Sequence, residues 1–211
     1  MSDRDFDVVV IGAGLGGLEV AYALASEGMS VCVLEKNQQL GGSLQVFSRD
    51  KTIFDTGVHY IGGLCPGQNL HRYLSYFGIM DKLKLHRMDM DGYDLCSMGD
   101  GPTEYPHAQG YDNFVRQLSE YFPQEKAGII QYTEEIQRMC RRFPLYNLED
   151  RDTQEWKDDD LGLNAKDHIA SMVRHPVLRN VLGGSSGLYA GDGRCSPFYV
   201  HALVTNTYIE S

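Results

Sequence analysis

The chain has 211 residues, of which 42% are hydrophobic and 23% are charged, and its formal net charge is −10. This composition is typical of a globular protein, and the acidic excess argues against nucleic acid or anionic lipid as an electrostatic partner. No stretch is apolar and long enough to span a bilayer, while a peripheral membrane contact stays open.

The cysteines and histidines show no metal or disulfide pattern. The five cysteines are widely spaced without a C-x-x-C pair, and the seven histidines include no H-E-x-x-H sequence. This predicts reduced thiols in a cytoplasmic protein and no metal site. The N-terminus is charged and passes directly into an apolar run, so we expect no secretory signal.

The first 35 residues predict a strand, a helix and a second strand. The run 8–11 is short, β-branched and continuously apolar, as in a strand of a parallel sheet that is buried on both faces. A helix is expected over 15–26 and ends near Gly28. Residues 30–34 then predict a second strand, with Glu35 at its end. This order is typical of a βαβ unit that binds a dinucleotide.

Three glycines between the first strand and the helix support nucleotide binding. Gly12, Gly14 and Gly17 have the spacing G-x-G-x-x-G, which suits a tight turn, a close approach of a pyrophosphate and close packing of helix on strand. The helix N-terminus favours a bound phosphate. Glu35 suits the ribose hydroxyls of an adenine nucleotide and would repel the 2′-phosphate of NADP, although Lys36 beside it has the opposite charge.

The sequence after Glu35 resembles a particular group of flavoproteins. The pair Gly41-Gly42 resembles the extended dinucleotide motif of amine-oxidase and phytoene-desaturase enzymes, with Ser43 where arginine is usual. The run 54–62, FDTGVHYIG, is similar to the phytoene dehydrogenase-related group, which includes carotenoid isomerases and retinol saturases. Weaker similarity lies at 110–114 and 196–202.

The resemblance implies an FAD-dependent oxidoreductase that desaturates, saturates or isomerises double bonds of an apolar, polyene-like small molecule. It implies an α/β fold, in which a Rossmann-like FAD-binding βαβ unit carries part of an inserted α+β substrate domain. No catalytic residue is assigned, and His59 and Tyr60 are the candidates nearest the flavin. The residues expected to bind the cofactor are Gly12, Ala13, Gly14, Leu15, Gly16, Gly17, Glu35, Lys36, Gly42, Ser43, Gly57, Val58 and His59.

Two other functions remain open. One is an amine-oxidase-like flavoenzyme, and the other is a nucleotide-binding module without catalysis. Only two parallel strands are expected, fewer than a doubly wound sheet needs, so we expect an N-terminal fragment or truncated product. The expected domains are a nucleotide-binding segment at 1–66 and part of a substrate domain at 67–211.

The remaining elements are predicted from periodicity and turn residues. Residues 44–47 and 52–54 predict a hairpin, and 83–86, 93–98 and 103–105 predict a short antiparallel sheet. Residues 149–160 are acidic and predict a solvated linker, and 183–187 predict a loop. Ser196 and Pro197 are expected to open a last helix. Further helices are expected at 68–77, 111–121, 125–143, 164–173 and 176–182.

Overall fold

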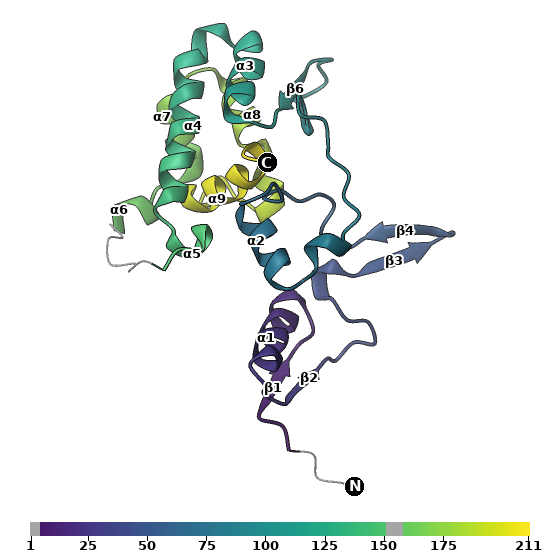
Figure 1. The fold of residues 1–211 in the computed structure, drawn as a ribbon. Helices are drawn as coiled ribbons and strands as arrows, with labels where there is room; N and C mark the ends of the chain where they lie inside the picture. The colour runs from purple at the N-terminus through teal and green to yellow at the C-terminus, as the bar shows by residue number, and fades with distance from the viewer. Residues whose placement is uncertain (1–4, 151–157) are drawn as a thin grey trace. The chain divides into compact units, whose positions relative to one another are not determined.

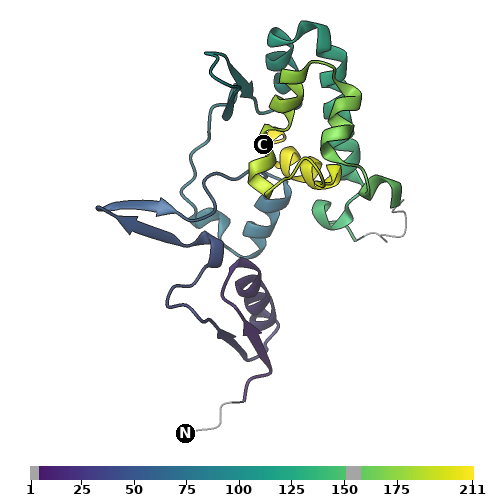
Figure 2. The ribbon, with the colours of Figure 1, turned by 180° about the vertical axis from the view of Figure 1, so that it is seen from behind.

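The computed structural model describes residues 5–150 and 158–211 (Figures 1 and 2). The chain divides into two compact units. The N-terminal unit comprises Met1–Ile61 and Leu74–Asp81, and the helical unit comprises Gly62–Tyr73 and Lys82–Ser211.

The N-terminal unit contains the predicted strand–helix–strand arrangement. Strand β1 (Val8–Ile11) is followed by helix α1 (Leu15–Ser26) and strand β2 (Val31–Leu34). The two strands pair in parallel, with Val8 opposite Val31 and Ile11 opposite Leu34. Gly28 has φ +88° just beyond α1, which fits its predicted role at the helix end. The predicted βαβ unit is therefore confirmed, with β2 starting one residue later than expected.

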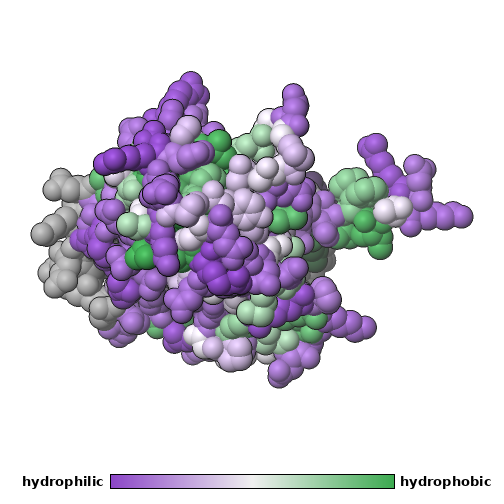
Figure 3. All heavy atoms as spheres, turned by 90° about the horizontal axis from the view of Figure 1, so that it is seen from above, coloured by the Kyte–Doolittle hydropathy of each residue, from purple (hydrophilic) through white to green (hydrophobic). Residues whose placement is uncertain are grey.

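A β-hairpin follows in the same unit. Strands β3 (Val46–Arg49) and β4 (Thr52–Asp55) pair antiparallel across a two-residue turn, Asp50 and Lys51, whose φ angles are both positive. Such a turn matches the twist of its strands. Residues 42–44 form a short 3-10 helix, so β3 begins two residues later than predicted. Figure 3 shows apolar side chains on the arm of the hairpin, behind a polar tip.

The segment after the hairpin confirms one predicted helix and corrects one predicted strand. Helix α2 spans Asn69–Tyr76. Residues 83–86 form no strand, although their side chains alternate, because no neighbouring strand pairs with them within the described residues. Strands β5 (Asp94–Ser97) and β6 (Glu104–His107) pair antiparallel. The predicted small sheet therefore has two strands.

The helical unit is built around helix α4 (Lys126–Arg141). Its buried face carries Ile129, Tyr132 and Ile136. Figures 1 and 2 show helix α7 (Ala165–Met172) lying beside it. A Cβ added at Gly128 would clash with the carbonyl oxygen of Met172, so this glycine permits the close approach of α7. The other helices packed in this unit are α3 (Tyr111–Tyr121), α7 (Ala165–Met172), α8 (Pro176–Leu182) and α9 (Phe198–Ile209).

Several details of the helical unit differ from prediction. Gly184–Tyr189 is a 3-10 helix, η4, rather than a loop. The N-cap of helix α9 is Pro197, which has no side-chain acceptor, so the helix has no side-chain cap. Ser196 lies one residue before the N-cap, and its hydroxyl accepts a hydrogen bond from the backbone N–H of Asp192. Two short helices that were not predicted are α5 (Pro144–Asn147) and α6 (Asp158–Leu161).

The predicted acidic linker lies mainly outside the described residues, which omit 151–157. Its last residue is described. Asp160 forms ion pairs with Arg142 and with Arg138, at 3.5 Å for the latter. This end of the segment therefore contacts helix α4 and the residue after it.

Candidate functional site

The glycine turn between β1 and α1 leaves a helix N-terminus open. Gly12 has φ +101°, a conformation that side chains disfavour, and Gly14 stands at the N-cap without a side-chain hydrogen bond. The backbone N–H groups of Leu15, Gly16 and Gly17 have no hydrogen-bond partner among the described residues. These donors and the positive end of the helix dipole suit a phosphate group.

Gly17 has the packing role predicted for it. A Cβ at this position would collide with the carbonyl oxygen of Gly12 and would lie 3.5 Å from the side chain of Val10. The third glycine of the motif therefore holds α1 close to the end of β1. By contrast, a Cβ at Gly16 would meet nothing within 4 Å, so this position of the first turn of α1 is not packed against other elements.

Glu35 at the end of β2 is bound to the glycine turn. Its Oε2 accepts a hydrogen bond of 2.8 Å from the backbone N–H of Ala13, and its Oε1 accepts one of 2.9 Å from that of Asn37. These two bonds, the first being the stronger influence, lower the pKa of the carboxyl group below its ordinary value. Each carboxylate oxygen keeps a further acceptor position for a ribose hydroxyl.

The second glycine pair packs directly on the first turn. The backbone N–H of Gly41 donates to the carbonyl of Ala13 at 2.7 Å, and Gly41 forms a parallel bridge with Gly14. A Cβ at Gly42 would lie 3.0 Å from the Cα of Gly14, so a larger residue would push the two turns apart. The sequence predicted that this pair faces the nucleotide, but it did not predict the backbone contact between the turns.

The segment 54–62, which also carries predicted cofactor residues, approaches the second glycine pair through Gly57. A Cβ there would lie 3.2 Å from the carbonyl oxygen of Ser43, which directly follows the glycine pair. Val58 and His59 come next on an exposed stretch, and among the described residues no hydrogen bond joins their side chains to the turns. Lys36 is likewise exposed.

The structure therefore brings together most of the predicted cofactor residues and leaves a few apart. The glycine turn, the Gly41-Gly42 pair and Gly57 lie next to one another, and Glu35 is hydrogen-bonded to the turn through the buried Ala13. Within the described part of the chain, no cluster of histidine, cysteine, aspartate or glutamate could hold a metal ion, and no helix is long and apolar enough to cross a membrane.

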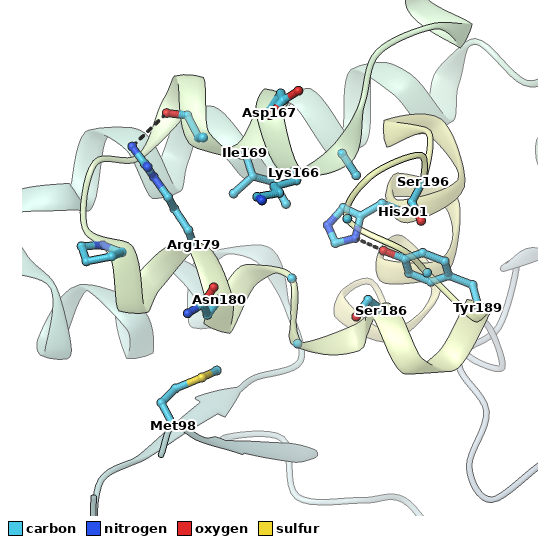
Figure 4. Close-up of a pocket in the computed structure, with 17 residues that line it drawn as sticks. Met98, Lys166, Asp167, Ile169, Arg179, Asn180, Ser186, Tyr189, Ser196 and His201 are labelled. Atoms are coloured by element: carbon cyan, nitrogen blue, oxygen red, sulfur yellow. Dashed lines mark hydrogen bonds between the residues drawn. The ribbon is translucent and has the colours of Figure 1, made fainter. Parts of the chain in front are cut away.

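The helical unit contains a buried polar group that the sequence did not reveal. His201 is fully buried, and its Nε2 lies 2.7 Å from the Tyr132 hydroxyl. Its Nδ1 lies 2.9 Å from the Tyr189 hydroxyl, a bond drawn in Figure 4. Burial lowers the pKa of His201 to about 4, so its imidazole is neutral at pH 7. No spacing rule joins these three residues, which lie on α4, η4 and α9.

Comparison with known proteins gives the same picture for the N-terminal part. Residues 10–77 match the family model of an NAD(P)-binding Rossmann-like domain. The all-trans-retinol 13,14-reductase of Rattus norvegicus is 36% identical over 97% of this chain and 36% of its own length. Prolycopene isomerase 2 of an Oncidium hybrid cultivar is 35% identical over 63% of this chain and 22% of its own length.

Among solved structures, putrescine oxidase bound to putrescine has a TM-score of 0.60 at 16% identity, covering 97% of this chain and 44% of that one. This likeness shows the fold. The two relatives confirm the resemblance to the phytoene dehydrogenase-related group that was inferred from the Gly41-Gly42 pair and from residues 54–62. The chain spans about a third of the length of the retinol reductase that it matches.

Proposed function

We propose that this chain is the FAD-binding part of a phytoene dehydrogenase-related oxidoreductase that acts on a polyene. The observation that carries the proposal is the meeting of three glycine segments at the open N-terminus of α1. Bound FAD would supply hydride transfer to or from its flavin ring.

Each protein group has a distinct part in the proposed site. The N–H groups of Leu15, Gly16 and Gly17 hold the pyrophosphate, for which Gly14 leaves room. The Glu35 carboxylate accepts hydrogen bonds from the ribose hydroxyls. It also orients the glycine turn by accepting a hydrogen bond from the backbone N–H of Ala13. The 2′-phosphate of NADP is negatively charged and would be repelled by this carboxylate, so the site disfavours NADP.

The identity of the nucleotide is the first test. Protein purified in the folded state is denatured, and the released nucleotide is identified by chromatography. We expect FAD, and recovery of a nicotinamide dinucleotide in its place would contradict the proposal. Because FAD absorbs visible light and oxidised nicotinamide dinucleotides do not, a yellow protein is the immediate sign.

A matched pair of variants tests the site itself. Glu35→Gln removes the negative charge of the carboxylate that accepts hydrogen bonds from two backbone N–H groups. The control, Glu27→Gln, removes a negative charge at an exposed position just after α1. We expect Glu35→Gln to weaken FAD binding about tenfold, since hydrogen bonds to charged groups contribute about 1.5–3 kcal/mol. Glu27→Gln should bind as the parent does, and equal losses in both variants would place the FAD elsewhere.

The substrate class follows from the relatives, whose names specify retinol and prolycopene, both polyenes. Turnover is tested with a polyene and an artificial electron acceptor. FAD binding without turnover of any polyene would favour the nucleotide-binding module. Turnover of an amine would favour the amine-oxidase-like alternative. The cytoplasmic location and the domain limits remain predictions.

A further inference from the structure

A second cavity lies within the helical unit, apart from the glycine turns. It has a volume of about 730 Å³ and opens between α7 and the segment formed by α8 and η4 (Figure 4). Met98, Ile169 and Pro176 contribute apolar wall, and Lys166, Arg179 and Tyr189 contribute polar groups. This size is typical of a site for a small organic molecule.

The Tyr132–His201–Tyr189 group places a hydroxyl beside this cavity. The Tyr132 hydroxyl lies 2.7 Å from His201 Nε2 and 3.4 Å from the carbonyl of Leu182, and the Tyr189 hydroxyl lies 2.9 Å from His201 Nδ1. In the neutral tautomer that carries its proton on Nδ1, the imidazole donates to the Tyr189 oxygen. The Tyr189 proton is then free to donate to a ligand.

Two cations line the same cavity. The Arg179 guanidinium donates hydrogen bonds to the carbonyls of Val173, at 2.9 Å, and Ala170, at 3.3 Å. The Lys166 side chain runs along Gly193 and forms no ion pair with any described residue. Asp167 is the one acidic residue of the lining, and Figure 4 shows its carboxylate pointing away from the Lys166 amine.

We infer that this cavity binds a small molecule that has a carboxylate and an apolar body. The carboxylate would pair with Lys166 and accept the free proton of Tyr189, and the apolar body would lie against Ile169 and Met98. The positive lining contrasts with the net charge of −10 on the whole chain. The inference is independent of FAD binding at the glycine turns, so either can fail without the other.

Two probes that share one polyene separate the carboxylate from the apolar body. Equilibrium dialysis of the full chain against all-trans-retinoic acid and all-trans-retinol measures both affinities. We expect the acid to bind about tenfold more tightly, since hydrogen bonds to a charged group contribute about 1.5–3 kcal/mol. Equal affinities would overturn the inference.

Variants locate the site. Lys166→Gln should remove most of the preference for the acid, while Lys126→Gln, an exposed lysine at the start of α4, should leave it unchanged. Tyr189→Phe should weaken both probes about fivefold, because its hydroxyl can donate to either oxygen, and Tyr121→Phe should weaken neither. A loss in Lys126→Gln equal to that in Lys166→Gln, or unchanged binding in Tyr189→Phe, would contradict the assignment. Far-UV circular dichroism verifies that each variant is folded.

Discussion

Different interactions stabilise the interior of each of the two units. In the N-terminal unit, Ala13 is the one buried apolar residue among those the structure describes, α1 buries none, and Ile11 on β1 is 87% exposed. In the helical unit, Ile136 and Leu178 are fully inaccessible. The first unit is therefore shaped mainly by its backbone, through glycine turns and the Glu35 hydrogen bonds, and the second mainly by packed side chains.

This difference has an energetic consequence. Burial of apolar surface contributes about 25 cal/mol per Å² and is the main source of stability, and parallel strands are normally covered on both faces. The N-terminal unit has the backbone geometry of a nucleotide-binding site, but it buries little apolar surface. We expect the helical unit to be stable by itself and the N-terminal unit to gain much of its stability from what binds it.

The largest effect should come from the core of the helical unit. Ile136→Ala removes a fully buried side chain from α4 and should lower the free energy of unfolding by about 2–5 kcal/mol. Ile11→Ala removes the same atoms from an exposed position and should change it by less than about 0.5 kcal/mol. Denaturant unfolding monitored by circular dichroism measures both. Similar losses would show that β1 is covered in solution.

Acid should weaken the helical unit through His201. Its folded pKa of about 4 lies below the ordinary value of 6.5, so the unfolded chain binds more protons between these pH values. The contribution of neutral His201 to the free energy of unfolding is therefore fully present above pH 6.5. It is lost as the pH falls towards 4, by on the order of 3 kcal/mol. Burial also lowers the pKa of His107, which acts in the same direction.

Unfolding midpoints measured at a series of pH values test this effect. The His201→Gln variant keeps a neutral polar side chain between Tyr132 and Tyr189 but cannot titrate. Its stability should depend less on pH than that of the parent, even if it is lower throughout. An unchanged pH dependence would show that other groups carry the effect.

The contrast between the units also explains what the sequence could predict. The βαβ unit depends on local signals, namely a β-branched run, glycine spacing and an acid at a strand end, and its helix α1 matched the predicted limits, 15–26. The Glu35–Ala13 bond and the Tyr132–His201 bond join residues 22 and 69 positions apart. Such contacts depend on tertiary packing, which periodicity does not encode. The wrongly predicted strand at 83–86 had the alternation but no partner strand in the part of the chain that the structure describes.

Added FAD should stabilise the N-terminal unit in particular. At a hundredfold excess over its dissociation constant, a ligand stabilises the state that it binds by about 2.7 kcal/mol. We therefore expect amide hydrogen exchange in β1, α1 and β2 to slow about a hundredfold, while the helical unit exchanges as before. Protection that appears only in the helical unit would contradict the proposed site.

A matched pair of variants sharpens that experiment. Gly17→Ala places a Cβ against the Gly12 carbonyl and should abolish the protection by separating α1 from the turn. Ser26→Ala, at the other end of the same helix, should keep it. Full protection in the Gly17→Ala variant would show that the turn tolerates a larger separation.

The smallest effect concerns the helix caps, which also differ between the units. Helix α7 is capped by Asn164, whose side-chain oxygen accepts a hydrogen bond of 3.1 Å from the backbone N–H of Asp167. Helix α1 has no side-chain cap. Asn164→Ala should lower the stability of the helical unit by about 1 kcal/mol, and Gln131→Ala, at an exposed position on α4, should not. Asn164→Asp should restore the loss, because a carboxylate accepts the same bond and interacts favourably with the helix N-terminus. If Asn164→Asp is as unstable as Asn164→Ala, the lost interaction is the weak 3.4 Å bond from the Asn164 amide to Gly193, which aspartate cannot donate.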